Sequence, residues 1–297
     1  MYKHPGQLFI QRHGDVEDAE DVMCYASFLR EESGLDPEPP IDLSRIYNQF
    51  HIPTPKRVPL QNQQGMVVNS DLGIIFINNG DIETRQRFTE AHELMELLFA
   101  ALPNRRGAIL GQAARFKYHI KERLCNEGAA ELIMPRSSFL PRLHRLRASY
   151  ETGRSLAYEF GVSISAALIH MTRIGPGHHA VVLWRMKNKP SEISSIISSN
   201  QLGLFADHSP TMPPKKLRVE WSFTGSGVSH IPLEKSIPGD SSVFAAWQTG
   251  TFTTGKDMLQ LAGVARLFRC ENQPFETNAE RLILSLLHCP GDTDCGF

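Results

Sequence analysis

The fold is decided by the stretch Arg87-Phe88-Thr89-Glu90-Ala91-His92-Glu93-Leu94-Met95-Glu96-Leu97-Leu98-Phe99. It contains neither Gly nor Pro, it is rich in residues that favour helices, and its apolar residues recur at helical spacing. The pattern therefore predicts a helix. At about 100° per residue, His92, Glu93 and Glu96 fall within one arc of roughly 100°, so a single metal ion could contact His92 and Glu96 while Glu93 lies beside it.

This arrangement differs by one residue from the motif His-Glu-x-x-His, in which two His bind zinc and the Glu activates a water molecule. Here Glu96 stands in place of the second His. The same polar residues also fit an ordinary solvated helix face with His92 at its edge. The motif therefore needs support from elsewhere in the chain.

A second predicted helix supplies that support, beginning near His119 and ending before Pro135. Glu122 and Asn126 are one turn apart on it, and Ala129 continues their face with a small side chain that allows close packing on the first helix. Such packing would bring Glu122 to the metal and place Asn126 to hydrogen-bond a ligand. A polar pair at a helix start is the alternative interpretation.

Three stretches of the chain together resemble the ImmA/IrrE family of zinc metallopeptidases, in the order 73–78, 87–94 and 122–135. The resemblance implies a zincin-like α+β peptidase domain, in which His92 and Glu122 bind zinc and Glu93 is the general base. In the family a second His binds the metal at the position of Glu96. We therefore expect the metal ligands to be His92, Glu96 and Glu122.

The change to Glu96 alters the charge of the site. A neutral imidazole is replaced by a carboxylate, so the ligand set carries two negative charges instead of one. A zinc ion with its charge cancelled would polarise water and a carbonyl less, and oxygen ligands favour harder ions such as Mn²⁺ or Mg²⁺. The site could be a working carboxylate-rich variant, a metal site without turnover, or an abandoned site. His119 could also supply the missing imidazole, although a solvent-facing side chain is the simpler interpretation.

By the resemblance, the expected function is that of a metal-dependent endopeptidase, a hydrolase that uses Zn²⁺ or another divalent cation such as Mn²⁺. The implied partner is a helix-turn-helix transcriptional repressor, whose cleavage derepresses stress or mobile-element genes. The alternative is a catalytically impaired pseudo-peptidase that acts as a protein-binding regulator. A weaker third hypothesis is a regulator that binds DNA through residues 155–174.

The domain organisation follows from changes in composition. We predict a metallopeptidase domain over 1–150, a helical pair resembling a helix-turn-helix over 151–176 and an α+β domain over 177–297, beginning after Gly175-Pro176-Gly177. Few basic or amide residues lie on the second helix of the pair, so it is expected to serve packing or partner docking rather than base reading. Some family members carry a GAF-like sensor domain in the last position, which implies a sensor-like role.

The remaining elements are predicted from periodicity and turn residues. A hairpin joins 65–68 to 74–77, and the strand 74–77 is the candidate for a cleft edge that pairs with an extended substrate, or else a core strand. The segment from Leu102 to Lys121 could form a basic loop over the cleft. Helices are predicted at 17–34, 41–50, 141–150 and 278–287, and strands at 180–186, 217–223, 242–247 and 263–270.

Composition sets broad limits. The 297 residues carry a net charge of −1, which gives no overall electrostatic reason to bind nucleic acid. The five Cys are scattered and odd in number, as expected for reduced thiols. The first residues lack the apolar core of a signal peptide, and no window approaches a transmembrane span. The chain is therefore expected to be cytoplasmic, without a membrane partner or direct nucleic-acid binding.

Overall fold

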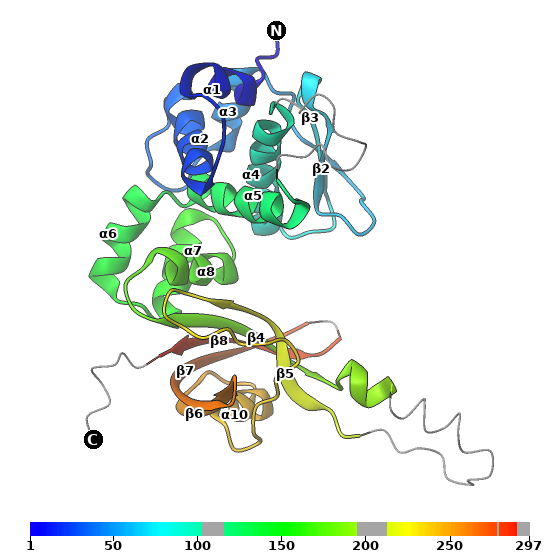
Figure 1. Ribbon diagram of the computed structural model, residues 1–297, viewed down its shortest axis with the longest axis vertical. Helices are drawn as coiled ribbons and strands as arrows, with labels where there is room; N and C mark the ends of the chain where they lie inside the picture. The colour runs from blue at the N-terminus through cyan, green and yellow to red at the C-terminus, as the bar shows by residue number, and fades with distance from the viewer. Residues whose placement is uncertain (103–115, 195–212, 278, 290–297) are drawn as a thin grey trace, which may run out of the picture. The chain divides into compact units, whose positions relative to one another are not determined.

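The computed structural model describes residues 1–102, 116–194, 213–277 and 279–289 (Figure 1). The chain divides into two compact units, unit 1 with residues 1–146 and 154–167 and unit 2 with residues 147–153 and 168–297. Each unit combines helices with a sheet, so the predicted α+β class is confirmed. Most of the predicted basic loop, most of the Ser- and Pro-rich stretch 191–214, and Cys295 lie outside the described residues.

Unit 1 is built mainly of helices. Those expected near 17–34 and 41–50 are present, and their first turns are capped by the carboxylates of Asp18 and Asp42, which accept backbone N–H groups. A first helix that the sequence did not predict precedes them. The helices before the helical pair are α1 (Pro5–His13), α2 (Ala19–Glu32), α3 (Leu43–Phe50), α4 (Glu83–Ala100), α5 (Tyr118–Ile133) and α6 (Arg136–Leu146).

The sheet of unit 1 has the order β1-β3-β2, with strands β1 (Lys56–Val58), β2 (Gly65–Asn69) and β3 (Ile74–Asn78). The predicted hairpin is present, because β2 and β3 pair antiparallel across a turn that ends at Gly73, whose φ is 64°. However, β3 pairs with a strand on each side. The expectation that 74–77 forms the cleft edge is therefore wrong, because β3 is the central strand and the edge strands are β1 and β2.

Helices α4 and α5 pack against each other, and α4 also contacts β2 and β3 (Figure 1). Gly128 of α5 makes the close approach possible. A Cβ atom there would lie 2.6 Å from the Met95 sulfur and 2.6 Å from a methyl carbon of Val22, which is closer than packed atoms allow. The predicted close packing of the two helices is present, and the small residue that permits it is Gly128, whereas the sequence analysis named Ala129.

The helical pair consists of α7 (Tyr150–Phe160) and α8 (Ile164–Ile174), joined at Gly161. The division between the two units falls within both helices. None of the residues from Ser163 to Ile174 is exposed. This burial fits a packing role for α8.

The helix before the pair differs from expectation, because α6 begins at Arg136 and carries Pro141 in its interior instead of in its first turn.

Unit 2 contains an antiparallel five-stranded sheet of order β5-β4-β8-β7-β6. One face of the sheet and helix α10 enclose a core that includes Trp184, Val219, Phe268 and Ile283. The elements are β4 (His179–Lys187), β5 (Lys216–Thr224), α10 (Ser242–Thr249), β6 (Thr253–Leu261), β7 (Val264–Glu276) and β8 (Arg281–His288).

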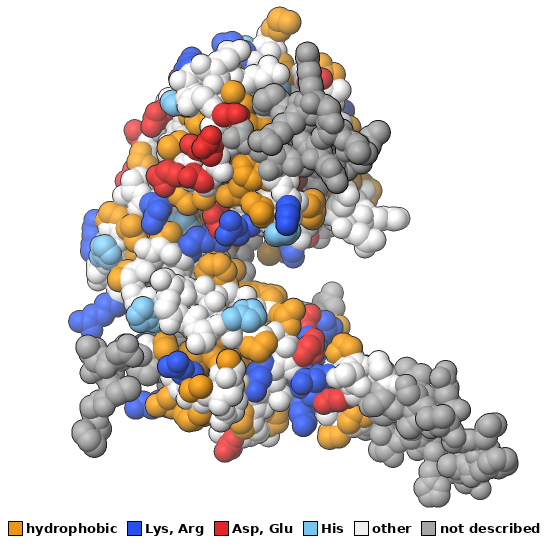
Figure 2. All heavy atoms as spheres, in the orientation of Figure 1, with side chains coloured by type: hydrophobic (Ala, Val, Ile, Leu, Met, Phe, Trp, Pro, Cys, Tyr) orange, Lys and Arg blue, Asp and Glu red, His pale blue; other side chains and the backbone are white. Residues whose placement is uncertain are grey.

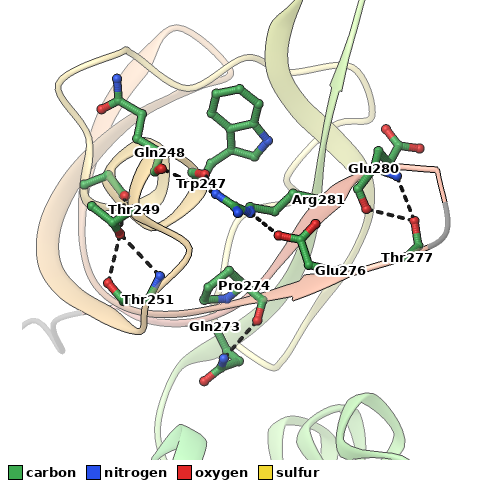
Figure 3. A network of polar contacts seen from close by, with 11 residues as sticks. Trp247, Gln248, Thr249, Thr251, Gln273, Pro274, Glu276, Thr277, Glu280 and Arg281 are labelled. Atoms are coloured by element: carbon green, nitrogen blue, oxygen red, sulfur yellow. Dashed lines mark hydrogen bonds and ion pairs between the residues drawn. The ribbon is translucent and has the colours of Figure 1, made fainter.

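Two predicted elements of unit 2 are wrong. The stretch 242–247 is helix α10 and not a strand, because Ser241 caps its start by accepting the Phe244 N–H and Gly250 ends it in a left-handed conformation. The stretch 278–287, expected to be a helix, contains strand β8. Figure 3 shows Arg281 of β8 donating to the carbonyl oxygen of Trp247 at 2.5 Å, which stabilises the end of α10.

Candidate metal centre

A cavity of about 610 Å³ lies in unit 1 among β2, α4, α5 and the segment before β2. The residues predicted to bind metal and to act as the base all line it. The lining residues are Asn62, Gln63, Gln64, Gly65, Met66, Val67, Phe88, Thr89, His92, Glu93, Glu96, Tyr118, Lys121, Glu122 and Asn126.

His92 lies at the centre of the predicted ligand set. Its Nδ1 atom is 3.1 Å from Oδ1 of Asn126, so Nδ1–H donates to this oxygen and Nε2 keeps its lone pair for a metal ion. Nε2 is 3.8 Å from Oε2 of Glu122 and 3.9 Å from Oε1 of Glu96. Small side-chain adjustments would bring these three atoms to distances at which they could bind a single ion. An imidazole and two carboxylates converging on one point suit a divalent cation.

Glu93 lies on the same helix but is buried, with 5% of its surface exposed. Strand β2 passes close above it: a Cβ atom on Gly65 would lie 2.9 Å from Oε1 of Glu93 and 2.5 Å from a carbon of Thr89. Burial and the negative charges of Glu96 and Glu122 raise the pKa of Glu93 to about 8, against the opposing effects of Lys121 and a backbone hydrogen bond at Val67. Without a metal ion, Glu93 therefore holds a proton at neutral pH.

Glu96 is held by two further residues of α5. Lys121 forms an ion pair with Oε2 of Glu96, and the thiol of Cys125 donates to Oε1 at 3.4 Å. Burial lowers the pKa of Lys121, but its hydrogen bond to Glu96 and the charge of that carboxylate outweigh burial and leave the pKa raised. Burial and the charge of Glu96 raise the pKa of the Cys125 thiol, which favours its protonated form.

Comparison with known proteins identifies this part of the chain. Residues 54–172 match the peptidase M78 family, described as the IrrE N-terminal-like domain. This segment is therefore similar to an IrrE N-terminal-like domain. The match includes His92, Glu93, Glu96 and Glu122, and it confirms the resemblance to the ImmA/IrrE family.

One solved structure, a Mycobacterium tuberculosis transcriptional regulator, is similar to the chain as a whole. The two share 12% sequence identity with a TM-score of 0.56, and the similarity covers 96% of this chain and 80% of the other. At this identity the similarity establishes the fold alone. No curated protein matches the chain.

The segment 54–172 offers two possible third ligands. Atoms of His92, Glu96 and Cys125 all lie within 4.8 Å of one another, so Cys125 could replace Glu122 in the ligand set. We favour Glu122, because its side chain lines the cavity and is 33% exposed. Cys125 is fully buried, and its thiol must lose a proton in order to bind a metal.

The sequence did not indicate that Lys121 and Cys125 would lie beside Glu96. Lys121 belongs to α5, so its assignment to a basic loop is wrong, and it points into the cavity. A signal was available, since Lys121, Glu122 and Cys125 fall within one turn of the predicted helix. His119 is exposed and does not line the cavity, which agrees with a solvent-facing role.

The surface outside residues 54–172 has its own charge pattern. In the view of Figure 2, acidic side chains gather over α2, where Asp18, Glu20 and Asp21 surround the helix start. These carboxylates complement the positive end of the helix dipole.

In the part of the chain that the structure describes, no helix is long and apolar enough to cross a membrane.

Proposed function

We propose that the chain is a metal-dependent endopeptidase that cleaves a protein partner. The observation that supports this proposal most directly is the convergence of His92 Nε2 with the carboxylates of Glu96 and Glu122, beside the buried Glu93. These residues line a cavity of about 610 Å³. The peptidase-family domain found in the same segment agrees with this function.

Each residue has a distinct role in the proposal. His92, Glu96 and Glu122 hold a divalent ion, with Zn²⁺ or Mn²⁺ as the candidates. When bound, the ion supplies Lewis acidity toward water and the substrate carbonyl, and its positive charge favours the ionised form of Glu93. Glu93 then takes a proton from the attacking water and delivers it to the leaving amine. Asn126 orients the His92 ring through Nδ1.

Strand β2 provides the binding edge for the substrate. Within the described residues it pairs with β3 alone, and Gly65, Met66 and Val67 line the cavity. An extended peptide can add to this edge by main-chain hydrogen bonds, which places one of its carbonyl groups near Glu93. We propose a helix-turn-helix repressor as the partner, on the basis of the family resemblance, so that cleavage would regulate transcription under stress.

Metal content tests the site directly. We expect protein purified without chelators to carry close to one equivalent of zinc or manganese by elemental analysis, and His92→Ala to carry almost none. His119→Ala is the matched control, because His119 is exposed and lies one turn before Glu122 on the same helix. An absence of metal in the wild-type protein, even after metal is added back, would reject the proposed site.

Cleavage tests the role of Glu93. In an assay with a verified partner protein, Glu93→Gln should lower the rate by about 100- to 10,000-fold, the usual contribution of a general base. The variant should still bind metal, since Glu93 is not in the ligand set. Unchanged cleavage by Glu93→Gln would contradict the proposed mechanism.

The presence of Glu96 and its ion pair with Lys121 supports a second candidate function, a non-catalytic regulator that binds a protein through the same cavity. Glu96→His distinguishes the two. A large gain in metal affinity and proteolysis indicates a degenerate site and favours the regulator. A loss of both shows that Glu96 is a working ligand.

A further inference from the structure

The carboxylate of Glu96 makes contacts through both of its oxygen atoms. Oε2 pairs with the ammonium of Lys121, while Oε1 accepts the Cys125 thiol and lies 3.9 Å from His92 Nε2. The Glu96 side chain is 17% exposed and that of Lys121 is 32% exposed, so the pair is partly shielded from water. Such a pair is screened less by salt than one on the open surface.

The charges of these groups can be added. Two carboxylates in the proposed ligand set, Glu96 and Glu122, carry two negative charges, whereas the His-His-Glu set of the family pattern carries one. The ammonium of Lys121 adds one positive charge at Glu96. The group of four residues with His92 therefore has a net charge of −1, which equals that of the family's ligand set.

We propose that Lys121 offsets the additional negative charge that Glu96 brings to the proposed ligand set, and that it acts through the Glu96 carboxylate. This inference rests on the proposed function. Lys121 precedes Glu122 in the chain, so one turn of α5 supplies both a metal ligand and the cation that balances another ligand. Carboxylate ligands in metal sites commonly need such a hydrogen-bonding partner.

The same geometry gives Lys121 two opposing effects. Its positive charge repels a dication and competes with it for Glu96, so the lysine weakens metal binding. It also withdraws negative charge from the ligands, so a bound ion polarises water and the substrate carbonyl more strongly. If Lys121 served only to hold Glu96 in place, the loss of Lys121 would disorder Glu96 and weaken metal binding.

The ion pair is tested first without metal. In chelator, the free energies of unfolding of Lys121→Met, Glu96→Gln and the double variant form a double-mutant cycle. We expect the two changes to be non-additive, because each removes the same interaction. Lys117→Met is the matched control, because Lys117 is the exposed N-cap residue of α5 and lies four residues before Lys121, and its effect should add to that of Glu96→Gln. Additive effects of Lys121→Met and Glu96→Gln would overturn the inference, whether or not the protein binds metal.

Metal titration and cleavage test the consequence. For Lys121→Met we expect the Kd of Zn²⁺ and Mn²⁺, measured by calorimetry, to fall by about tenfold and kcat to fall as well, with no change in Lys117→Met. A Kd in Lys121→Met that equals or exceeds that of the wild-type protein would overturn the inference. The separate proposal of a metal site in the wild-type protein would still stand. If the Lys121→Met variant binds metal and the wild-type protein does not, this result would support the role of Lys121 and reject the endopeptidase proposal.

Discussion

Unit 1 and unit 2 each contain a cluster of polar side chains away from bulk water, but the two clusters are partnered differently. In unit 2, Trp184 Nε1 donates to Ser285 Oγ at 3.0 Å, Ser285 to Asn272 at 2.6 Å, Asn272 to Ser242 at 2.9 Å and Ser242 to Asp257 at 2.6 Å. We call these five residues the sheet network. Its members form a continuous chain of hydrogen bonds across the sheet.

The cleft cluster of unit 1, formed by His92, Glu93, Glu96 and Glu122, is different. Its three acidic side chains approach one another, and the nearest distances between His92 and its acidic neighbours are too long for hydrogen bonds. Satisfied buried networks stabilise a fold, whereas converging carboxylates oppose it. The comparison indicates that the sheet network serves stability and that the cleft cluster is kept for binding.

The largest expected effect concerns Glu93 and pH in metal-free protein. The pKa of Glu93 is raised from its ordinary value of 4.5 to about 8 by burial and by Glu96 and Glu122. In the unfolded chain the carboxyl group of Glu93 ionises near pH 4.5. The contribution of protonated Glu93 to the stability of the fold is therefore fully present below pH 4.5 and is lost as the pH rises through 8. We expect unit 1 of the wild-type protein to lose up to about 5 kcal/mol relative to Glu93→Gln over this range.

Hydrogen exchange of α4 and α5 in chelator, at pH values from 5 to 8, measures this difference. Added metal should abolish the slope, because the ion favours ionised Glu93. If the wild-type protein and Glu93→Gln show parallel pH profiles, the carboxylates do not interact as described.

The second prediction has the opposite sign and concerns unit 2. Burial, followed by the positive charge of His288, lowers the pKa of His179 from 6.5 to about 4. The unfolded chain binds this proton below pH 6.5, so stability is lost as pH falls from 6.5 through 4. We expect the loss to reach at most about 3 kcal/mol.

Acid unfolding of unit 2 in His179→Gln and in His230→Gln measures this effect. His230 is exposed and belongs to the same unit, which makes it the control. Only the change at His179 should flatten the pH dependence. An equal response of the two variants would show that His179 is not the group responsible.

The third prediction tests the sheet network. Asn272 is fully buried, and Asn272→Ala removes the partner of Ser285 and the donor to Ser242. We expect a loss of about 2 to 3 kcal/mol in the free energy of unfolding of unit 2, measured by urea denaturation. Thr254→Ala on the exposed side of β6 should cost less than about 0.5 kcal/mol. Similar losses in both variants would remove the distinction between network and surface.

The smallest expected effect lies at the edge of the cleft cluster. Asn126→Ala removes the acceptor for His92 Nδ1–H and leaves the ligand set intact. Metal affinity should fall by about tenfold, measured by competition with a chromogenic chelator, with little loss of fold stability. Gln63→Ala, which alters the cavity lining without contacting His92, serves as the control. A large loss of fold stability in Asn126→Ala would place this residue with the structural network instead.

The helices of the site could be predicted from sequence because their signals are local. Periodicity gave α4 and α5, and the helical spacing placed Glu122 and Asn126 on one face. The ion pair between Lys121 and Glu96 depends on how α4 and α5 are rotated about their axes where they pack together. No spacing within one helix contains that information.

The errors in unit 2 have a different origin. Strand β8 is a nearly continuous apolar run, buried from Ile283 to His288, and such a run is consistent with a strand or a buried helix. The reverse error at α10 arose because Val243, Phe244 and Trp247 favour strands. Here the cap at Ser241 and the stop at Gly250 outweighed that preference.

The position of the tryptophans has a practical consequence. All three, Trp184, Trp221 and Trp247, belong to unit 2. Intrinsic tryptophan fluorescence therefore reports on unit 2 alone, and the metal centre of unit 1 is optically silent in this signal. A change in tryptophan emission when metal is added would consequently show that metal binding in unit 1 alters the surroundings of a tryptophan in unit 2.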